Sequence, residues 1–155
     1  MENLQMKSIT AMELQESSFS YLGSKIANSN LLRLQLLNGS CRELTNPKLG
    51  REFLAGTLED GKSLGVFRRS ILRSVEFVLD PELSSLTISY AREAIGELLS
   101  RQHFPTQAKL GYLEPEWTVQ KIRLVGVAKG FLITEYFQNP AVPIASLGLI
   151  ELDCA

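Results

Sequence analysis

The strongest constraint on the fold is a pair of tight-turn signals, each set between short runs that alternate apolar and polar residues. Asn38-Gly39 follows the alternating run 32–36, and Asp60-Gly61 follows a run over 50–58. Such dipeptides favour hairpin turns, and a period of two is typical of a half-buried strand. Five short strands joined by tight turns predict a small closed β-barrel. The remaining strands are expected at 41–44, 64–67 and 71–78.

One amphipathic helix is expected to follow this block. Apolar residues from Tyr90 to Leu99 form a stripe opposite charged residues, which predicts a helix over 86–101 that ends before Phe104-Pro105. A capping box at Thr10 to Glu13 also predicts a short helix near the N-terminus. The expected organisation is an N-terminal segment plus first barrel over 1–80, a linker helix over 81–105, and a second barrel over 106–155.

The two β-rich blocks resemble each other. Residues 49–54 are similar to 125–132, and residues 66–76 are similar to 142–151, at an offset of about 76 residues. Chance similarity between short apolar strands is the alternative explanation. A duplication predicts a chain that is mainly β, with two tandem five-stranded barrels and one central helix.

The segment Phe67-Arg68-Arg69-Ser70-Ile71-Leu72-Arg73-Ser74-Val75 resembles the closing hairpin of the Sm-like small β-barrels, which include the bacterial Sm-like RNA chaperone. It matches the family motif in its apolar positions and in Arg68, and it departs at Arg69, where the motif has glycine. The family's Asp-x-apolar-x-Asn run is not visible between Gly50 and Gly61. The arrangement also resembles a tandem-barrel family of uncharacterised bacterial proteins. The resemblance implies a fold more than an activity.

Composition argues against several classes of protein. The chain has 16 basic and 17 acidic residues, whereas a dedicated nucleic-acid binder usually has a basic excess. Cys41 and Cys154 are far apart and belong to no metal-binding motif, so we expect no metal. No run approaches the ~18 apolar residues of a membrane span, and no signal peptide is visible. We therefore expect a cytoplasmic protein without a membrane partner.

Catalysis has little support in the sequence. His103 is the single histidine, and it lies at the end of the expected helix, where a cation interacts favourably with the helix dipole. No Ser, Cys or carboxylate is placed to complete a catalytic triad, and no Gly-rich phosphate loop is present. We expect a non-catalytic protein with no cofactor.

A basic hairpin is the feature that points most directly to a ligand. Arginine binds phosphate through its planar fork, so the cluster predicts binding of RNA or single-stranded nucleic acid. The alternative is that neighbours on one strand face opposite sides and that nearby glutamates neutralise them. The cluster consists of Arg68, Arg69, Arg73, Lys62 and Arg51. Burial rather than base stacking is expected for Phe53, Phe67, Phe77, Phe131 and Phe137.

Two further features predict contact with a protein. Trp117 lies between acidic residues in an expected loop, where it could anchor a partner. The run 144–152 is apolar and lacks Lys and Arg, which predicts an open strand edge with Ile144 and Leu147 as contact residues, although burial in a barrel core explains it equally well. Such units pair with each other as a pseudo-dimer, or with a second chain as an oligomer. Our first hypothesis is an interaction or assembly module, and the alternative is nucleic-acid binding.

Overall fold

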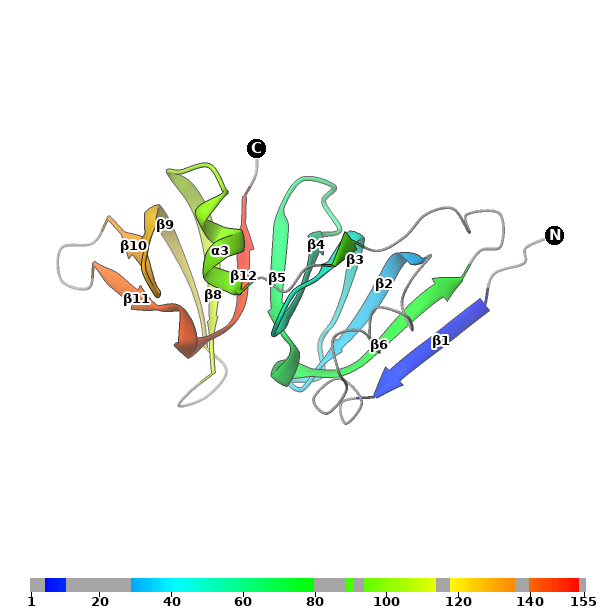
Figure 1. Ribbon diagram of the computed structural model, residues 1–155. Coiled ribbons are helices and arrows are strands. Elements are labelled where there is room, and N and C mark those ends of the chain that lie inside the picture. Colours follow the sequence, from blue (N-terminus) through cyan, green and yellow to red (C-terminus); the bar gives the residue numbers. More distant parts are fainter. Residues whose placement is uncertain are drawn as a thin grey trace.

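The computed structural model describes residues 5–10, 29–79, 89–90, 94–113, 118–135 and 140–153 of the 155. The described chain is mainly β and forms one continuous sheet, antiparallel except where β7 pairs with β3 (Figure 1). The strands are β1 (Gln5–Thr10), β2 (Ser29–Leu36), β3 (Cys41–Leu49), β4 (Phe53–Thr57), β5 (Leu64–Arg68), β6 (Leu72–Leu79), β7 (Ser89–Tyr90), β8 (Thr106–Tyr112), β9 (Thr118–Ala128), β10 (Phe131–Thr134), β11 (Ala141–Pro143) and β12 (Leu147–Leu152). The helical elements are α3 (Ile95–Ser100) and the 3-10 turns η1 (Arg69–Ile71) and η3 (Ile144–Ser146).

The strands fall into two groups with the same order of pairing. The first group is β6-β2-β3-β4-β5, and the second group is β12-β8-β9-β10-β11. In each group a 3-10 turn joins the last two strands along the chain. The registers also correspond. Leu32 of β2 pairs with Leu44 of β3 in the first group, and Ala108 of β8 pairs with Ile122 of β9 in the second, and all four residues are buried. Positions in one group can therefore be compared directly with positions in the other.

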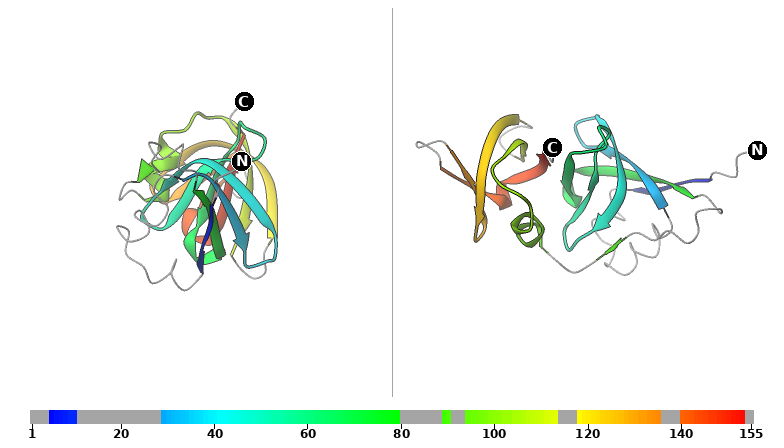
Figure 2. Two further views of the ribbon diagram at one scale, coloured as in Figure 1. Left: turned by 90° about the vertical axis from the view of Figure 1, so that its right-hand side faces the viewer. Right: turned by 90° about the horizontal axis from the view of Figure 1, so that it is seen from above.

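The predicted fold of two closed barrels is wrong. The structure has a single open sheet, in which β1 lies at one end and β11 at the other. The first group does not close on itself, because the free edge of β5 pairs with β12, in the register Leu64–Leu152 to Phe67–Leu149. This pairing joins the two groups side by side in the middle of the molecule (Figures 1 and 2).

The predicted central helix over 86–101 is also wrong. Residues Ser89 and Tyr90 form β7, which pairs with Lys48 and Leu49 of β3. The helix α3 has six residues, and its apolar side buries Ile95, Leu98 and Leu99 in the core of the second group, so it does not separate two barrels. The short helix predicted near the N-terminus lies outside the described residues. The domain boundaries at 80 and 106 stay a prediction.

The predicted glycine turns are confirmed. Gly39 lies in the turn between β2 and β3, and Gly61 lies in the turn between β4 and β5. Their φ angles are +91° and +74°, in the left-handed region that glycine adopts without the strain a side chain would cause. Lys129-Gly130 likewise forms the two-residue turn between β9 and β10, with φ of +79° at the glycine.

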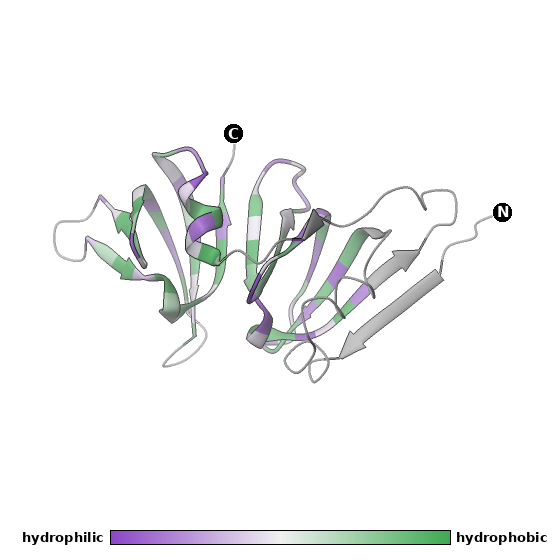
Figure 3. Cartoon of the chain, viewed as in Figure 1, coloured by the Kyte–Doolittle hydropathy of each residue, from purple (hydrophilic) through white to green (hydrophobic). Residues whose placement is uncertain are grey.

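Two hydrophobic cores lie on opposite faces of the strands where the groups meet. Phe67 and Leu149 belong to the first core, whereas their neighbours Val66 and Ile150 belong to the second. Successive side chains of a strand point to opposite faces, so β4, β5 and β12 are buried on both. Strands buried on both faces read as nearly continuous apolar runs, which is visible along these three strands in Figure 3.

The two ends of the sheet are the strands β1 and β11. At one end, β1 pairs with β6 over six residues. The strand of the second group that corresponds to β6 is β12, and there the same edge is paired with β5. At the other end, β11 contains Pro143, which has no N–H to donate. The Pro143 oxygen accepts a hydrogen bond of 2.7 Å from Ser146 Oγ. A proline on an edge strand discourages pairing with another chain.

Candidate functional site

Arg68, the last residue of β5, connects the two groups of strands. Its Nε donates to the main-chain oxygen of Leu147 at 2.8 Å, and its Nη2 donates to that of Ile144 at 3.0 Å. Its Nη1 donates to the Glu52 carboxylate at 3.0 Å. The side chain is only 14% exposed. All three nitrogen atoms of this predicted phosphate ligand are therefore engaged inside the molecule.

Arg69 and Arg51 lie together beside this connection. Arg69 Nη2 donates to the main-chain oxygen of Arg51 at 2.8 Å. Burial lowers the pKa of the Arg69 guanidinium, and the nearby charge of Glu52 opposes that shift. Within the described residues, Arg69 Nη1 is buried without a hydrogen-bond partner. The hydrogen bond between the two arginines thus joins the turn η1 to the connection between β3 and β4.

Lys62 is separate from these arginines, and Arg73 follows η1 on β6. Lys62 is exposed in the turn before β5, whereas Arg69 follows the other end of that strand. The five residues of β5 hold its two ends about 13 Å apart. Arg73 is exposed on β6. The structure therefore brings Arg68, Arg69 and Arg51 together and leaves Lys62 at the other end of β5.

The residues predicted to contact a partner are not on a free edge. Ile144 is 7% exposed and Leu147 is 1% exposed, and both belong to the second core. The strand β12 pairs with β5 on one side and β8 on the other. The apolar run 144–152 thus serves the pairing of the two groups within one chain. Trp117 lies outside the described residues.

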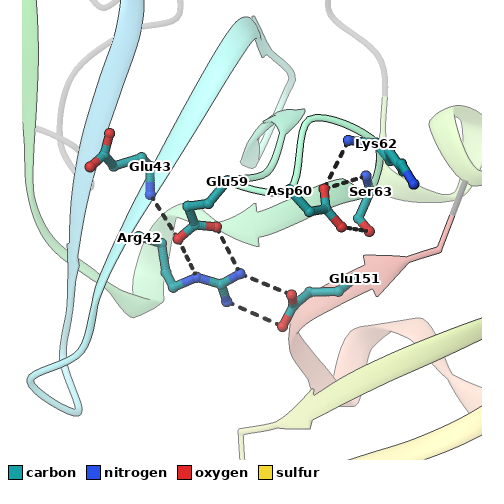
Figure 4. A network of polar contacts seen from close by, with 7 residues as sticks. All are labelled: Arg42, Glu43, Glu59, Asp60, Lys62, Ser63 and Glu151. Atoms are coloured by element: carbon teal, nitrogen blue, oxygen red, sulfur yellow. Dashed lines mark hydrogen bonds and ion pairs between the residues drawn. The ribbon is translucent and has the colours of Figure 1, made fainter.

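Arg42, which the sequence analysis did not single out, makes a second connection between the groups (Figure 4). It lies on β3 and donates to Glu59 from Nε at 3.0 Å, and to Glu151 of β12 from Nη2 at 2.9 Å and Nη1 at 3.2 Å. Its guanidinium carbon lies 5.9 Å from the centre of the Phe67 ring. The hydrogen bond to Glu151 raises the pKa of Arg42, against the effect of burial. No local pattern links residues 42 and 151, so only the pairing of β5 with β12 reveals this contact.

A pair of lysines lines a cleft next to this network. Lys109 of β8 and Lys121 of β9 lie directly opposite each other in register, and both are exposed. The cleft has a volume of about 410 Å³, and its lining includes Asp60, Glu151 and Asp153. Like charges in directly opposed positions destabilise a sheet, so the lysine pair has no evident structural role. No local sequence pattern predicts the register that brings the two lysines together.

Three of the exposed large apolar side chains lie on β9 and β10. Val119, Val125 and Phe131 are 53%, 43% and 42% exposed, and Leu37, in the turn after β2, is the other large apolar residue that is exposed in the described chain. Burial of Phe53 and Phe67 is confirmed, whereas the predicted burial of Phe131 is wrong. Its neighbour Leu132 points into the second core, so Phe131 points outward.

The described residues offer no obvious catalytic or metal centre. They contain no group of three His, Cys, Asp or Glu side chains placed to hold a metal ion. The helices of the described chain are too short to cross a membrane. Comparison with known proteins returned no match, whether to family models, curated proteins or solved structures. The site therefore has to be judged from its own geometry.

Proposed function

We propose that the chain is a non-catalytic protein-interaction module that docks its partner on the outer face of β9 and β10. Phe131 and Val125, two half-exposed apolar residues, mark this face, and Lys121 and Arg123 extend it along β9. Exposed aromatic and aliphatic side chains that gather at one place are typical of interaction sites.

The proposal depends on a comparison of Phe131 with Phe53, the residue at the same position in the first group. Phe131 pairs with Pro143, the residue before η3, just as Phe53 pairs with Arg68, the residue before η1. Phe53 is fully buried, because the second group packs over it. Phe131 occupies the same place in the second group, and it is 42% exposed because the described chain has no third group to cover it. The same surface is thus covered by protein in one group and open in the other.

The charges of this face favour a different protein over a second copy. Lys121 and Arg123 lie on the same side of β9, and Arg123 is 3.6 Å from Glu135 in a solvent-exposed pair. Two copies that met face to face would bring like charges together, which costs affinity. At the edge of the sheet, β11 contains Pro143, which discourages pairing with a second copy. We expect a partner with an apolar surface flanked by acidic residues.

The test compares capture of partners by three forms of the protein. The wild type and Leu37→Ser, which removes an equally exposed apolar residue elsewhere, should retain the same proteins from a source extract. The double variant Val125→Ser, Phe131→Ser should lose them at least tenfold by quantitative mass spectrometry. Equal retention by all three forms would contradict the proposal. A wild-type dimer in sedimentation velocity that the double variant abolishes would assign the face to self-association instead.

Binding of RNA or single-stranded nucleic acid is the alternative proposal, supported by the exposed side chains of Arg51 and Arg73. It is weaker because Arg68 is engaged internally. Fluorescence anisotropy with labelled mixed-sequence RNA at low and moderate salt tests it. Micromolar binding that weakens steeply with salt and is lost in Arg69→Glu would favour this alternative. No binding at low salt would remove it.

A further inference from the structure

A row of alternating charges crosses the first group of strands. Arg33 of β2 pairs in register with Glu76 of β6 on one side and with Glu43 of β3 on the other. Opposite charges in directly opposed positions stabilise a sheet. The row therefore alternates in sign, and no two like charges stand opposite each other.

The corresponding row of the second group does not alternate in sign. Glu151 of β12 pairs with Lys109 of β8, which pairs with Lys121 of β9. The row lies next to the buried pair Ala108 and Ile122, as the first row lies next to Leu32 and Leu44. A lysine stands where the first group has Glu43, so alternation is replaced by two adjacent positive charges.

The nearest carboxylate of this row is engaged elsewhere. Both oxygens of Glu151 accept hydrogen bonds from Arg42, at 2.9 and 3.2 Å. Within the described residues, the side chain of neither Lys109 nor Lys121 forms a hydrogen bond or an ion pair. Two exposed ammonium groups thus face the cleft without a partner of their own.

The cleft itself has walls of opposite charge. Lys109 and Lys121 form part of its lining, and Asp60 and Asp153 form another part. A nucleic-acid strand, which is anionic along its whole length, would meet these carboxylates as well as the lysines. A polypeptide can place a single carboxylate between the lysines and hydrogen-bond donors beside the aspartates, so its charges complement both walls.

We infer that the cleft binds an Asp or Glu side chain of a partner polypeptide between Lys109 and Lys121. The inference rests on the proposed function and names the chemistry of the partner. Lys121 and Val125 are four residues apart on β9, which corresponds to about 13 Å. An extended partner segment should therefore carry its acidic residue about four positions from the apolar residue that contacts Val125 and Phe131.

A random twelve-residue peptide library displayed on phage and selected on the full chain tests the inference. Selected peptides should carry Asp or Glu about four positions from a large apolar residue. Lys121→Glu, which restores the alternation seen in the first group, should weaken their binding at least tenfold, and so should the amide form of the peptide's acidic residue. Lys129→Glu removes an exposed lysine outside the cleft lining and should change affinity less than twofold.

The thermal midpoint of Lys121→Glu should equal or exceed that of the wild type, because a like-charge pair is removed. Peptides that depend on Phe131 but not on Lys121 would overturn the inference and leave the proposed function standing. Peptides that depend on neither residue would overturn both. Single-stranded RNA that binds the wild type and is lost in Lys121→Glu would overturn the inference in favour of a polyanion.

Discussion

The guanidinium of Arg68 donates a hydrogen bond of 3.0 Å to the main-chain oxygen of Ile144, 76 positions further along the chain. From the sequence, Arg68 was expected to contact nucleic acid and Ile144 was expected to contact a protein partner. In the structure the two residues contact each other. The bond ties the end of β5 to the turn η3, and with the bond to Leu147 it fixes the second group against the first.

Arg68→Ala should therefore destabilise the fold. The change removes the two charged hydrogen bonds to the main-chain oxygens of Ile144 and Leu147, as well as the one to Glu52. The free energy of unfolding should therefore fall by about 2–4 kcal/mol. Urea denaturation measures the change. Arg73→Ala, at an exposed position on β6, is the control and should stay within about 0.5 kcal/mol of wild type. Equal effects of the two changes would show that Arg68 does not hold the groups together.

Acid should weaken the fold through Glu59 and Asp60. Hydrogen bonds from the Ser63 hydroxyl and from the N–H groups of Ser63 and Lys62 lower the pKa of Asp60 from 3.8 to about 2. At Glu59, burial opposes the shift, but the hydrogen bond from Arg42 and its charge lower the pKa overall.

Both carboxyls have a lower pKa in the folded state than in the unfolded state. Their contribution to stability is therefore present above about pH 4 and is lost as the pH falls toward 2. The urea midpoint, measured from pH 6 to pH 2, should decrease as the pH falls below about 4. The decrease should be less steep in Asp60→Asn. An identical slope in that variant would contradict the assignment.

Gly50→Ala should destabilise the first group. A Cβ atom at Gly50 would lie 2.0 Å from Cε1 of Phe53, whose ring is fully buried and cannot move freely. Such overpacking costs about 1–3 kcal/mol, measurable by thermal or urea unfolding. Gly126→Ala is the matched control, because a Cβ there meets nothing within 4 Å. A stability of Gly50→Ala equal to that of Gly126→Ala would contradict the close contact.

Removal of β1 should expose the edge of β6. Deleting residues 1–10 leaves one side of β6 unpaired. The same side of β12, the corresponding strand, is paired with β5. Exposed strand edges associate, so we expect concentration-dependent self-association in sedimentation velocity experiments. Deleting residues 1–4 alone keeps β1 and should leave the sedimentation coefficient unchanged with concentration. A truncated chain that behaves like this control would show that β1 does not protect the edge.

The local elements of the fold were predictable because they depend on neighbours in the sequence. Gly39, Gly61 and Gly130 mark turns because they adopt φ angles that other residues avoid. Alternation located the strands around these turns, since it reflects one buried and one exposed face. The helix over 86–101 was wrong for a related reason. Its apolar stripe satisfied a helical period, but at Ser89 and Tyr90 the pairing with β3 prevailed.

The partner of each strand edge was not predictable from the pattern. β5 can satisfy its backbone groups equally well by closing a barrel or by pairing with another strand, and the apolar run at 147–152 suits both. In the structure β5 pairs with β12. Arg68 and Arg42 add hydrogen bonds to Leu147 and Glu151 of β12, and Val66 and Ile150 share the second core. These contacts join residues that no local window contains.

Phe53 and Phe131 show where the two kinds of information separate. The sequence predicts that each lies in a strand and carries an apolar side chain, at matching points of two similar blocks. Only the tertiary structure decided that one would be fully buried and the other 42% exposed. The physical reason is that burial depends on what packs against a face. The second group covers Phe53, and within the described chain no further group covers Phe131.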